Sequence, residues 1–364
     1  MIQPRLFDLF SAYARLDKCT DPLMKLNDII EWELFRPKLQ SIRKNDLIGR
    51  KGFDVVMMFK VLILQALYNL SDDAMEYMLR DRLSFMRFLG LTMTDKVPDA
   101  KTIWKYREQL TEAELIKPLF DKFEEYLRTK GFQASGGQLI DATIIQVPVQ
   151  HNSKEETEQI KEGQVPENWS EAKAEQKDTD ARWTQKGKKS FYGYKDHINA
   201  DAEHKIIRNY EVTSANTHDS QVFEEIVLLP TNISEEGSIE HEVVYADSAY
   251  YSEQIRIHLE VNGIESKICS KCYRNKELSE EEKARNRESS KTRCRVEHIF
   301  GAMYQKAHDR VMRSIGFLRA KAVIGLRNLA YNMTRYGYLS GAKGVWCKII
   351  EIGGEMGKIS PNKS

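Results

Sequence analysis

Long hydrophobic runs are absent from this sequence of 364 residues. Its longest apolar stretches, such as Val61 to Leu64, are far too short to cross a bilayer. Arg5 and Asp8 interrupt the start of the chain before the apolar core of a signal peptide could form. Cysteine is scarce, and five cysteines at irregular spacing argue against the disulfide framework of a small secreted domain. These absences predict a soluble, cytoplasmic protein without a membrane partner.

A strong net charge is also lacking, because 55 basic and 54 acidic residues give a formal charge of +1. The charges are nevertheless segregated along the chain. Residues 153–180 are rich in acidic side chains and lack apolar periodicity, which predicts a mobile loop or insertion. Basic residues dominate at 182–189 and again at 267–327. A near-neutral total can therefore hide a surface that binds nucleic acid.

The order of predicted elements indicates the fold class. Helical spacing of apolar residues predicts an all-helical N-terminal domain at 1–131, and Ser71 with Asp72 offers a helix cap within it. Runs of apolar and β-branched residues then predict strands at 138–147, 191–200, 204–213 and 241–247. With helices between them, they predict an α/β domain at 132–340 that carries a polar insertion at 150–186. The tail at 341–364 is expected to be loosely ordered.

Three carboxylates lie where an unpaired charge is costly. Asp141 is embedded in an apolar run, Asp247 ends another, and Glu297 borders the apolar face of a basic helix. A shared divalent cation would pair them, and oxygen ligands favour Mg2+, which also binds substrate phosphates. Two such ions about 4 Å apart can activate an attacking oxygen and stabilise a leaving one. Taken singly, Asp141 and Glu297 are as consistent with a strand-end residue or a helix-surface charge.

Residues of the basic segments are candidates for contacts to DNA. The candidate contacts are Arg182, Trp183, Lys186, Lys188, Lys189, Arg293 and Arg295. Trp183 stands in a Gly-containing loop, where its indole either stacks on a base or anchors the loop onto the sheet. Arg293 lies one helical turn before Glu297 and can pair with that glutamate or reach a phosphate beside it.

Two further groups of residues carry alternatives. Cys269, Cys272, Cys294 and His298 have a spacing that a structural zinc site could use. A closed zinc site around Glu297 would compete with magnesium chemistry, so we expect free thiols. His218 and Asp219 follow a predicted strand, where we expect helix capping, with a polar layer behind the metals as the alternative.

Several blocks of sequence stand out together. They are Leu139–Thr143, Lys189–Lys195, Tyr245–Tyr250 and Arg295–Gly301. These blocks resemble the catalytic motifs of bacterial insertion-sequence transposases of the DDE type, in the group named after insertion sequence five. Residues 68–99 are similar to that group's helical N-terminal domain, so the resemblance covers nearly the whole chain. Arg293 and Glu297 fit the signature around the final acid, whereas Ser290 and Tyr304 replace its tyrosine and lysine.

The resemblance implies an RNase H-like catalytic core in which Asp141, Asp247 and Glu297 hold two Mg2+ ions, with Mn2+ as a substitute. Such transposases bind double-stranded DNA at terminal inverted repeats, cut the element ends and join the freed 3′-hydroxyl to target DNA. The resemblance further implies a homo-oligomer on DNA and DNA-end binding by the helical domain. Two alternatives stay open: a metal-dependent nuclease that cuts without joining, and a domesticated DNA-binding descendant, against which the intact acids argue.

Overall fold

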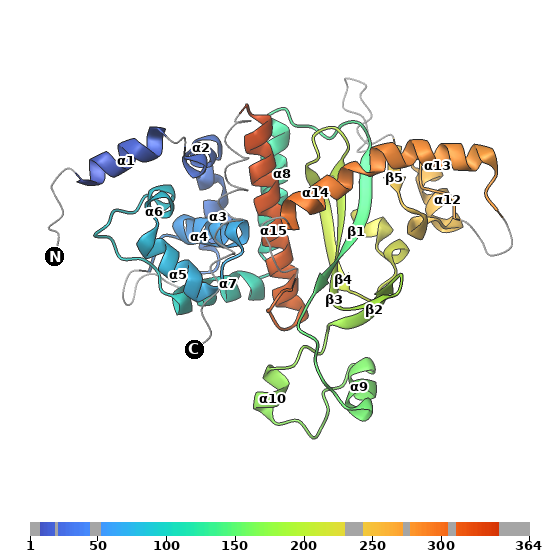
Figure 1. Cartoon of the computed structure of the whole chain (residues 1–364), viewed down its shortest axis with the longest axis horizontal. Coiled ribbons are helices and arrows are strands. Elements are labelled where there is room, and N and C mark those ends of the chain that lie inside the picture. The colour runs from blue at the N-terminus through green and yellow to red at the C-terminus, as the bar shows by residue number, and fades with distance from the viewer. Residues whose placement is uncertain are drawn as a thin grey trace. The chain divides into compact units, whose positions relative to one another are not determined.

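A computed structural model describes residues 8–18, 21–43, 52–229, 243–271, 277–304 and 311–341. The chain divides into two compact units, and Figure 1 labels their elements. The first unit contains the described residues up to Phe123 together with those from Leu326 onward. The second contains Glu124–Tyr304 and the described residues between there and Gly325.

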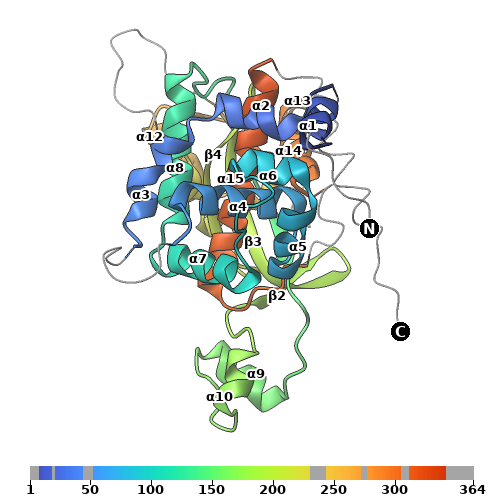
Figure 2. The ribbon, with the colours of Figure 1, turned by 90° about the vertical axis from the view of Figure 1, so that its left-hand side faces the viewer.

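The first unit is helical, and Figure 2 shows its helices face on. Its elements are α1 (Asp8–Lys18), α2 (Pro22–Ile29), η1 (Trp32–Phe35), α3 (Arg36–Gln40), α4 (Val55–Tyr68), α5 (Asp72–Asp81), α6 (Leu83–Leu89), α7 (Ala100–Glu112), the first part of α8 (Ile116–Thr129) and the last part of α15 (Phe317–Leu339). Ser71 caps α5 by accepting a hydrogen bond from the Ala74 N–H at 3.1 Å, which confirms the predicted cap.

Helix α4 forms the core of this unit because it is apolar on almost every side. Asp54 caps its start by accepting from the N–H groups of Val56 and Met57, and Asn69 ends it in a left-handed conformation. Phe59 packs against the rings of Trp32 and Phe35 at centroid distances of 6.4 and 4.9 Å. Among the described helices, none is by itself long and apolar enough to span a membrane. Helices α4 and α5 satisfy that test only together, across a bend of 105°.

A mixed sheet forms the centre of the second unit. Its strands are β1 (Gln138–Gln146), β2 (Arg182–Lys186), β3 (Lys189–Asp201), β4 (Ile207–Ser214), β5 (Val243–Ala246) and β6 (Glu265–Ser266). β1 pairs antiparallel with β3 and parallel with β5. β3 also pairs antiparallel with β2 and β4, and β5 pairs parallel with β6. The predicted α/β architecture and the four predicted strand regions are therefore confirmed. Residues 182–186 were expected to form a loop, and that prediction is wrong because they form β2.

Glycines explain the shape of the β2–β3 hairpin and its junction with β1. Gly187 has a φ of 64° in the two-residue turn that joins β2 to β3. Gly193 lies opposite Gln146, where an added Cβ would be 2.0 Å from the carbonyl oxygen of Ile145. Only glycine lets β1 and β3 approach each other this closely.

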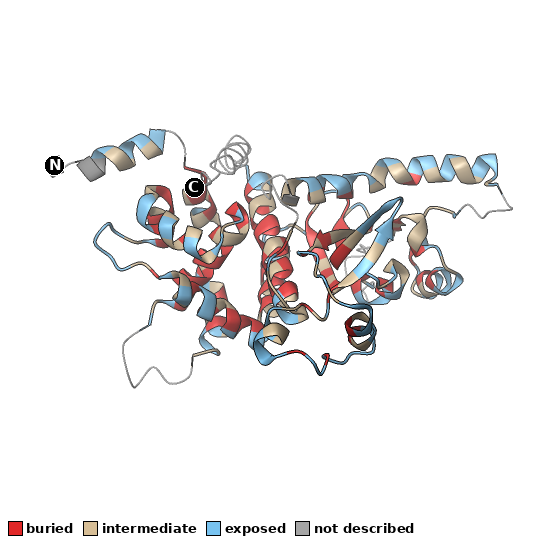
Figure 3. Cartoon of the chain, turned by 60° about the horizontal axis from the view of Figure 1, so that its bottom comes forward, coloured by how far each residue is buried: buried red, intermediate tan, exposed pale blue. Residues whose placement is uncertain are grey.

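Helices cover the sheet and complete the second unit. An apolar cluster joins β1 and β5 to α11 (Phe223–Ile226) and α12 (Glu253–Val261). Helix α13 (Glu280–Arg293) is largely exposed, as the pale and tan ribbon in Figure 3 shows. Helix α14 (Arg295–Tyr304) packs against β1 and buries Val296 and Ile299. The two helices are interrupted at Cys294, the C-cap of α13, which keeps a right-handed helical conformation.

The acidic segment between β1 and β2 is a folded insertion, so of the two predicted alternatives the insertion is confirmed and the mobile loop is wrong. It contains α9 (Lys154–Lys161) and α10 (Glu171–Glu175), which project from the rest of the unit in Figure 1. Ser153 and Glu156 form a reciprocal capping box at the start of α9. Glu156 also accepts from Nε1 of the buried Trp169 at 2.6 Å and from Nζ of Lys173 at 2.8 Å. One buried tryptophan and one multiply bonded glutamate thus organise a segment without apolar periodicity, named here the α9–α10 lobe (153–180).

Candidate active site

Asp141, within β1, and Asp247, directly after β5, lie at the same level of neighbouring strands. In the parallel pair β1–β5, Leu139 lies opposite Tyr245 and Ile140 opposite Ala246. Asp141 is the next residue of β1, and Asp247 directly follows β5. Paired strands lie about 4.8 Å apart. The sheet therefore brings together two acids that are far apart in the sequence.

Asp141 is largely buried and lies in the field of the second carboxylate, Asp247. Its side chain is 18% exposed. The pKa of Asp141 is raised to about 6, chiefly by burial and also by the charge of Asp247, while the Ala142 N–H, Arg293 and Lys186 act in the opposite direction. Oδ1 of Asp141 accepts from the Ala142 N–H at 2.8 Å. The local positive charges thus compensate this carboxylate only in part.

The last predicted acid is not gathered with the other two. Glu297 lies in the first turn of α14 with an exposed side chain. Arg293 instead faces Asp141, with Nη1 3.5 Å from Oδ2. The sequence suggested that Arg293 pairs with Glu297 or contacts phosphate, and the structure gives it Asp141 as its carboxylate partner. No cluster of three or more acidic, histidine or cysteine side chains suited to hold a metal occurs in the described part of the chain.

Cys269 and Cys294, the cysteines that the structure describes, form no disulfide. Sγ of Cys269 lies 3.9 Å from Oγ of Ser290, and Sγ of Cys294 donates to the Lys291 carbonyl at 3.1 Å. His298 contacts Nζ of Lys205 through Nδ1 at 3.0 Å. Cys272 lies outside the described residues, as does the side chain of Tyr304.

The basic segment predicted to contact DNA has two kinds of residue. Lys186, Lys188 and Lys189 are exposed at the end of the β2–β3 hairpin and form no ion pair with the described residues. Arg182 is different, because its guanidinium donates to the carbonyls of Ile160, Thr179 and Ala181. These bonds fasten the α9–α10 lobe to β2 and give Arg182 a structural role, while its contact with phosphate stays a prediction.

Trp183 and Arg295 also have protein partners. The indole of Trp183 packs on the ring of Tyr192 at a centroid distance of 5.3 Å and remains 51% exposed. This contact fits the anchoring alternative, while half of the ring stays accessible. Nη1 of Arg295 donates to the Ala202 carbonyl at 2.9 Å, although the side chain is exposed overall.

A second polar group, which the sequence did not single out as a unit, lies on β3. Lys195 donates from Nζ to Oδ1 of Asp219 at 2.8 Å and to the Thr217 carbonyl at 2.7 Å. The fully buried His197 has Nδ1 4.0 Å from the same Asp219 oxygen and Nε2 2.9 Å from Oγ1 of Thr213. Burial lowers the pKa of His197 to about 4, so its ring is neutral at pH 7.

Residue types alone gave little warning of this group. Its available signals were Lys195, at the end of the block 189–195, and Asp219, for which the sequence left a polar layer behind the metals as an alternative to helix capping. The predicted capping role holds for His218, whose side chain accepts from the Ser220 N–H at 3.3 Å at the start of η2 (Asp219–Gln221).

Two family profiles match the sequence. The family described as "Transposase DDE domain" matches residues 133–333, and the one described as "Transposase domain (DUF772)" matches residues 10–109. One similar solved structure is the cryo-EM structure of a piggyBac transposase synaptic complex with hairpin DNA. It is 11% identical, with a TM-score of 0.42, over 94% of this chain and 83% of that chain. The chain belongs to the DDE transposase family, and the matched region contains the α/β core described above.

Proposed function

We propose that this protein is a transposase of the insertion-sequence-five group that binds terminal inverted repeats, cleaves the element ends and joins the 3′-hydroxyl to target DNA. The observation that carries this proposal is the adjacency of Asp141 and Asp247 inside the region matching the DDE domain. An RNase H-like core is part of the proposal. It is supported by the central β1, with antiparallel strands β3 and β4 on one side and parallel strands β5 and β6 on the other.

Mg2+, or Mn2+ in its place, fits the side chains at this site. Asp141 and Asp247 present hard oxygen donors, and the pKa of the buried Asp141 is raised, so the pair favours a cation. Asp141, Asp247 and Glu297 would hold the metal. When bound, two such ions activate an attacking oxygen and stabilise a leaving oxygen in phosphoryl transfer.

Glu297 joins the pair, in this proposal, through a rearrangement where α13 meets α14. The two helices are interrupted at Cys294, between Arg293 and Glu297, so a small rotation there moves these two side chains relative to each other. Turning Glu297 toward Asp141 displaces the guanidinium of Arg293, whose contact with Asp141 is long at 3.5 Å. The freed guanidinium then contacts a DNA phosphate, for which its planar fork is well suited.

The β2–β3 hairpin supplies further DNA contacts. Lys186, Lys188 and Lys189 are exposed together, and the charge of Lys186 acts on Asp141. Phosphates held by these lysines would lie near the carboxylate pair and fix the position of the duplex without reading its sequence. Recognition of the inverted repeats is assigned to the helical unit, and a homo-oligomer holds the two ends.

The test uses full-length protein, Mg2+ and a labelled duplex ending in the inverted repeat that flanks the gene, with a plasmid as target. We expect cuts at the element end and products joined to the plasmid, and neither with a scrambled end. Cutting without joining would identify a metal-dependent nuclease instead. Binding without cutting would identify a DNA-binding descendant.

A further inference from the structure

Helix α7 of the helical unit has one side that is firmly fixed to its neighbours. The hydroxyl of Tyr106 donates to the Val55 carbonyl, at the start of α4, at 2.9 Å. The guanidinium of Arg107 donates to both carboxylate oxygens of Asp72, at the start of α5, at 2.7 and 2.8 Å. Ile103, on the same side, is completely buried. Helix α7 is therefore held rigidly against α4 and α5.

The opposite side of α7 is open over the first half of the helix. Trp104 is 48% exposed, and Lys101 and Lys105 are exposed on the same side, about one helical turn apart. These three residues are named here the α7 face. Their side chains form no hydrogen bond, ion pair or ring contact with the described residues. Glu108, the next residue along this side, is buried and separates the α7 face from the exposed Glu112.

Two acidic side chains contact the start of α7, and both already have partners there. Asp99 caps the helix by accepting from the Thr102 N–H at 2.7 Å. Glu76 of α5 accepts from the Ala100 N–H at 2.8 Å and pairs with Arg80 at 2.7 Å. The α7 face consequently presents two ammonium groups without an ion-pair partner, beside an accessible indole.

We propose that the α7 face binds double-stranded DNA, with α7 lying in the major groove. The inference deepens the proposed function, because it rests on the assignment of inverted-repeat binding to the helical unit. Duplex DNA matches both chemistries of this face, and its major groove is wide enough to admit an α-helix. Phosphates pair with Lys101 and Lys105 and supply affinity with little sequence information. The indole of Trp104 contacts base edges, where apolar side chains pack against thymine methyl groups.

The test measures binding of full-length variants to element-end and random duplexes by fluorescence anisotropy at several salt concentrations. Lys101→Ala/Lys105→Ala should weaken binding to both duplexes and flatten the log–log salt dependence by about 0.9 for each lost contact. Trp104→Ala should instead lower the ratio of the element-end affinity to the random affinity by about 5- to 150-fold, as the loss of a contact to one base pair does.

Lys25→Ala is the control for the loss of a positive charge. Lys25 lies on α2, and Figures 1 and 2 both show α2 at the upper edge of the helical unit and α7 at its lower edge. This variant should bind both duplexes as the parent does. The three side chains of the α7 face make no contacts within the described part of the chain, so every variant should melt at the temperature of the parent.

Unchanged affinity, salt slope and affinity ratio in the α7 variants, with a parent that still prefers element ends, would overturn this inference and leave the proposed function standing. An equal loss in Lys25→Ala would overturn it as well, because only net charge would then matter. A parent that forms a dimer without DNA, and a monomer after Trp104→Ala, would assign the face to a second copy of the chain. A parent that binds both duplexes equally would refute the proposed recognition of inverted repeats itself, and the role of α7 with it.

Discussion

Arg208 pairs with two buried acids of the second unit, Asp201 and Glu124. Its side chain is 1% exposed, with Nε 3.1 Å from Oδ2 of Asp201 and Nη1 3.0 Å from Oε1 of Glu124. Asp201 is itself fully buried and also accepts from the N–H groups of His204 and Ile206. The guanidinium of Arg208 therefore pairs with two acids that are shielded from water, and Glu124 has a second cation in Arg128, whose Nε lies 2.8 Å from its Oε2.

Arg208→Met should destabilise the protein by about 3–5 kcal/mol, because it leaves the buried Asp201 without its guanidinium partner and Glu124 with Arg128 alone. Urea denaturation measures the free energy of unfolding. Arg256→Met is the control, since Arg256 is 55% exposed and its pair with Glu253 should contribute only about 0–1 kcal/mol. Equal losses in the two variants would contradict this account of the buried network.

At the scale of single residues, the sequence indicated some of the side chains that lie together and gave no sign of others. Asp141 and Asp247 could be proposed as partners because each interrupts an apolar run. The network of Arg208 could not, since Glu124 lies 84 residues away and nothing local marks the pair. The orientation of Arg293 toward Asp141 was likewise hidden, because the two residues lie 152 positions apart in the sequence.

Among the elements, the β2–β3 hairpin carries the clearest functional expectation. The basic segment 182–189 is too short to show strand periodicity, so the sequence indicated a loop. In the structure Gly187 instead lies in the turn of a β-hairpin. The turn brings Lys186 and Lys189 opposite each other and leaves Lys188 at the tip. Three exposed ammonium groups are thus concentrated at one end of the sheet.

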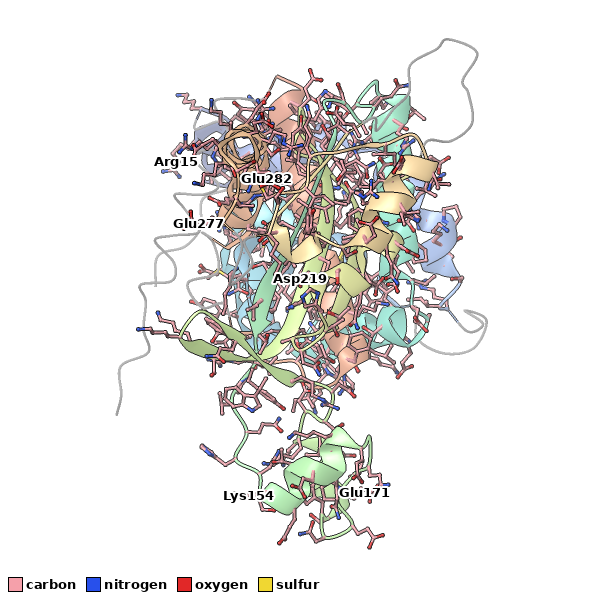
Figure 4. All side chains as sticks on the ribbon, turned by 90° about the vertical axis from the view of Figure 1, so that its right-hand side faces the viewer. Arg15, Lys154, Glu171, Asp219, Glu277 and Glu282 are labelled. Atoms are coloured by element: carbon pink, nitrogen blue, oxygen red, sulfur yellow. The ribbon has the colours of Figure 1, made fainter. Side chains whose placement is uncertain are left out.

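Lys188→Ala/Lys189→Ala should weaken binding to element-end and random DNA alike, because phosphate contacts carry little sequence information. Each lost contact should also flatten the log–log salt dependence by about 0.9. Fluorescence anisotropy titrations at several salt concentrations measure both quantities. Lys154→Ala, on the lobe in Figure 4, is the control. Unchanged affinity and slope in the double variant would mean that these lysines form only a solvated surface.

The α9–α10 lobe gives a prediction about pH. Hydrogen bonds from Lys173, the Ser153 N–H and Trp169 lower the pKa of Glu156 to about 2 from an ordinary value of 4.5. A depressed carboxyl pKa stabilises the lobe above the unfolded value, and that contribution is lost as pH falls from about 4.5 to about 2. The indole N–H resonance of Trp169, assigned with Trp169→Phe, should change over this window.

Glu156→Gln should remove that dependence, because the amide does not titrate in this range. Glu171→Gln, at the exposed start of α10, is the matched control and should behave as the parent does. The same transition in the Glu156→Gln protein would show that another group controls the lobe.

For the whole molecule, the sequence predicted the α/β class and the helical N-terminal region correctly. The alternation of apolar runs determines such elements locally. The boundary of the two compact units differs from the predicted one. The residues of α15 from Leu326 onward belong to the helical unit, whereas the sequence predicted a single domain from 132 to 340. That grouping depends on contacts between distant segments, which periodicity does not report.

The central claim is that Asp141, Asp247 and Glu297 act together in DNA cleavage and joining. Its most direct test is the cleavage rate of a labelled element end by full-length Asp141→Asn, Asp247→Asn and Glu297→Gln proteins in Mg2+. We predict that each change lowers the rate by about a hundredfold or more, while DNA binding and melting temperature stay close to the parent values. Near-normal cleavage by any one of these folded proteins would remove that residue from the site and contradict the account.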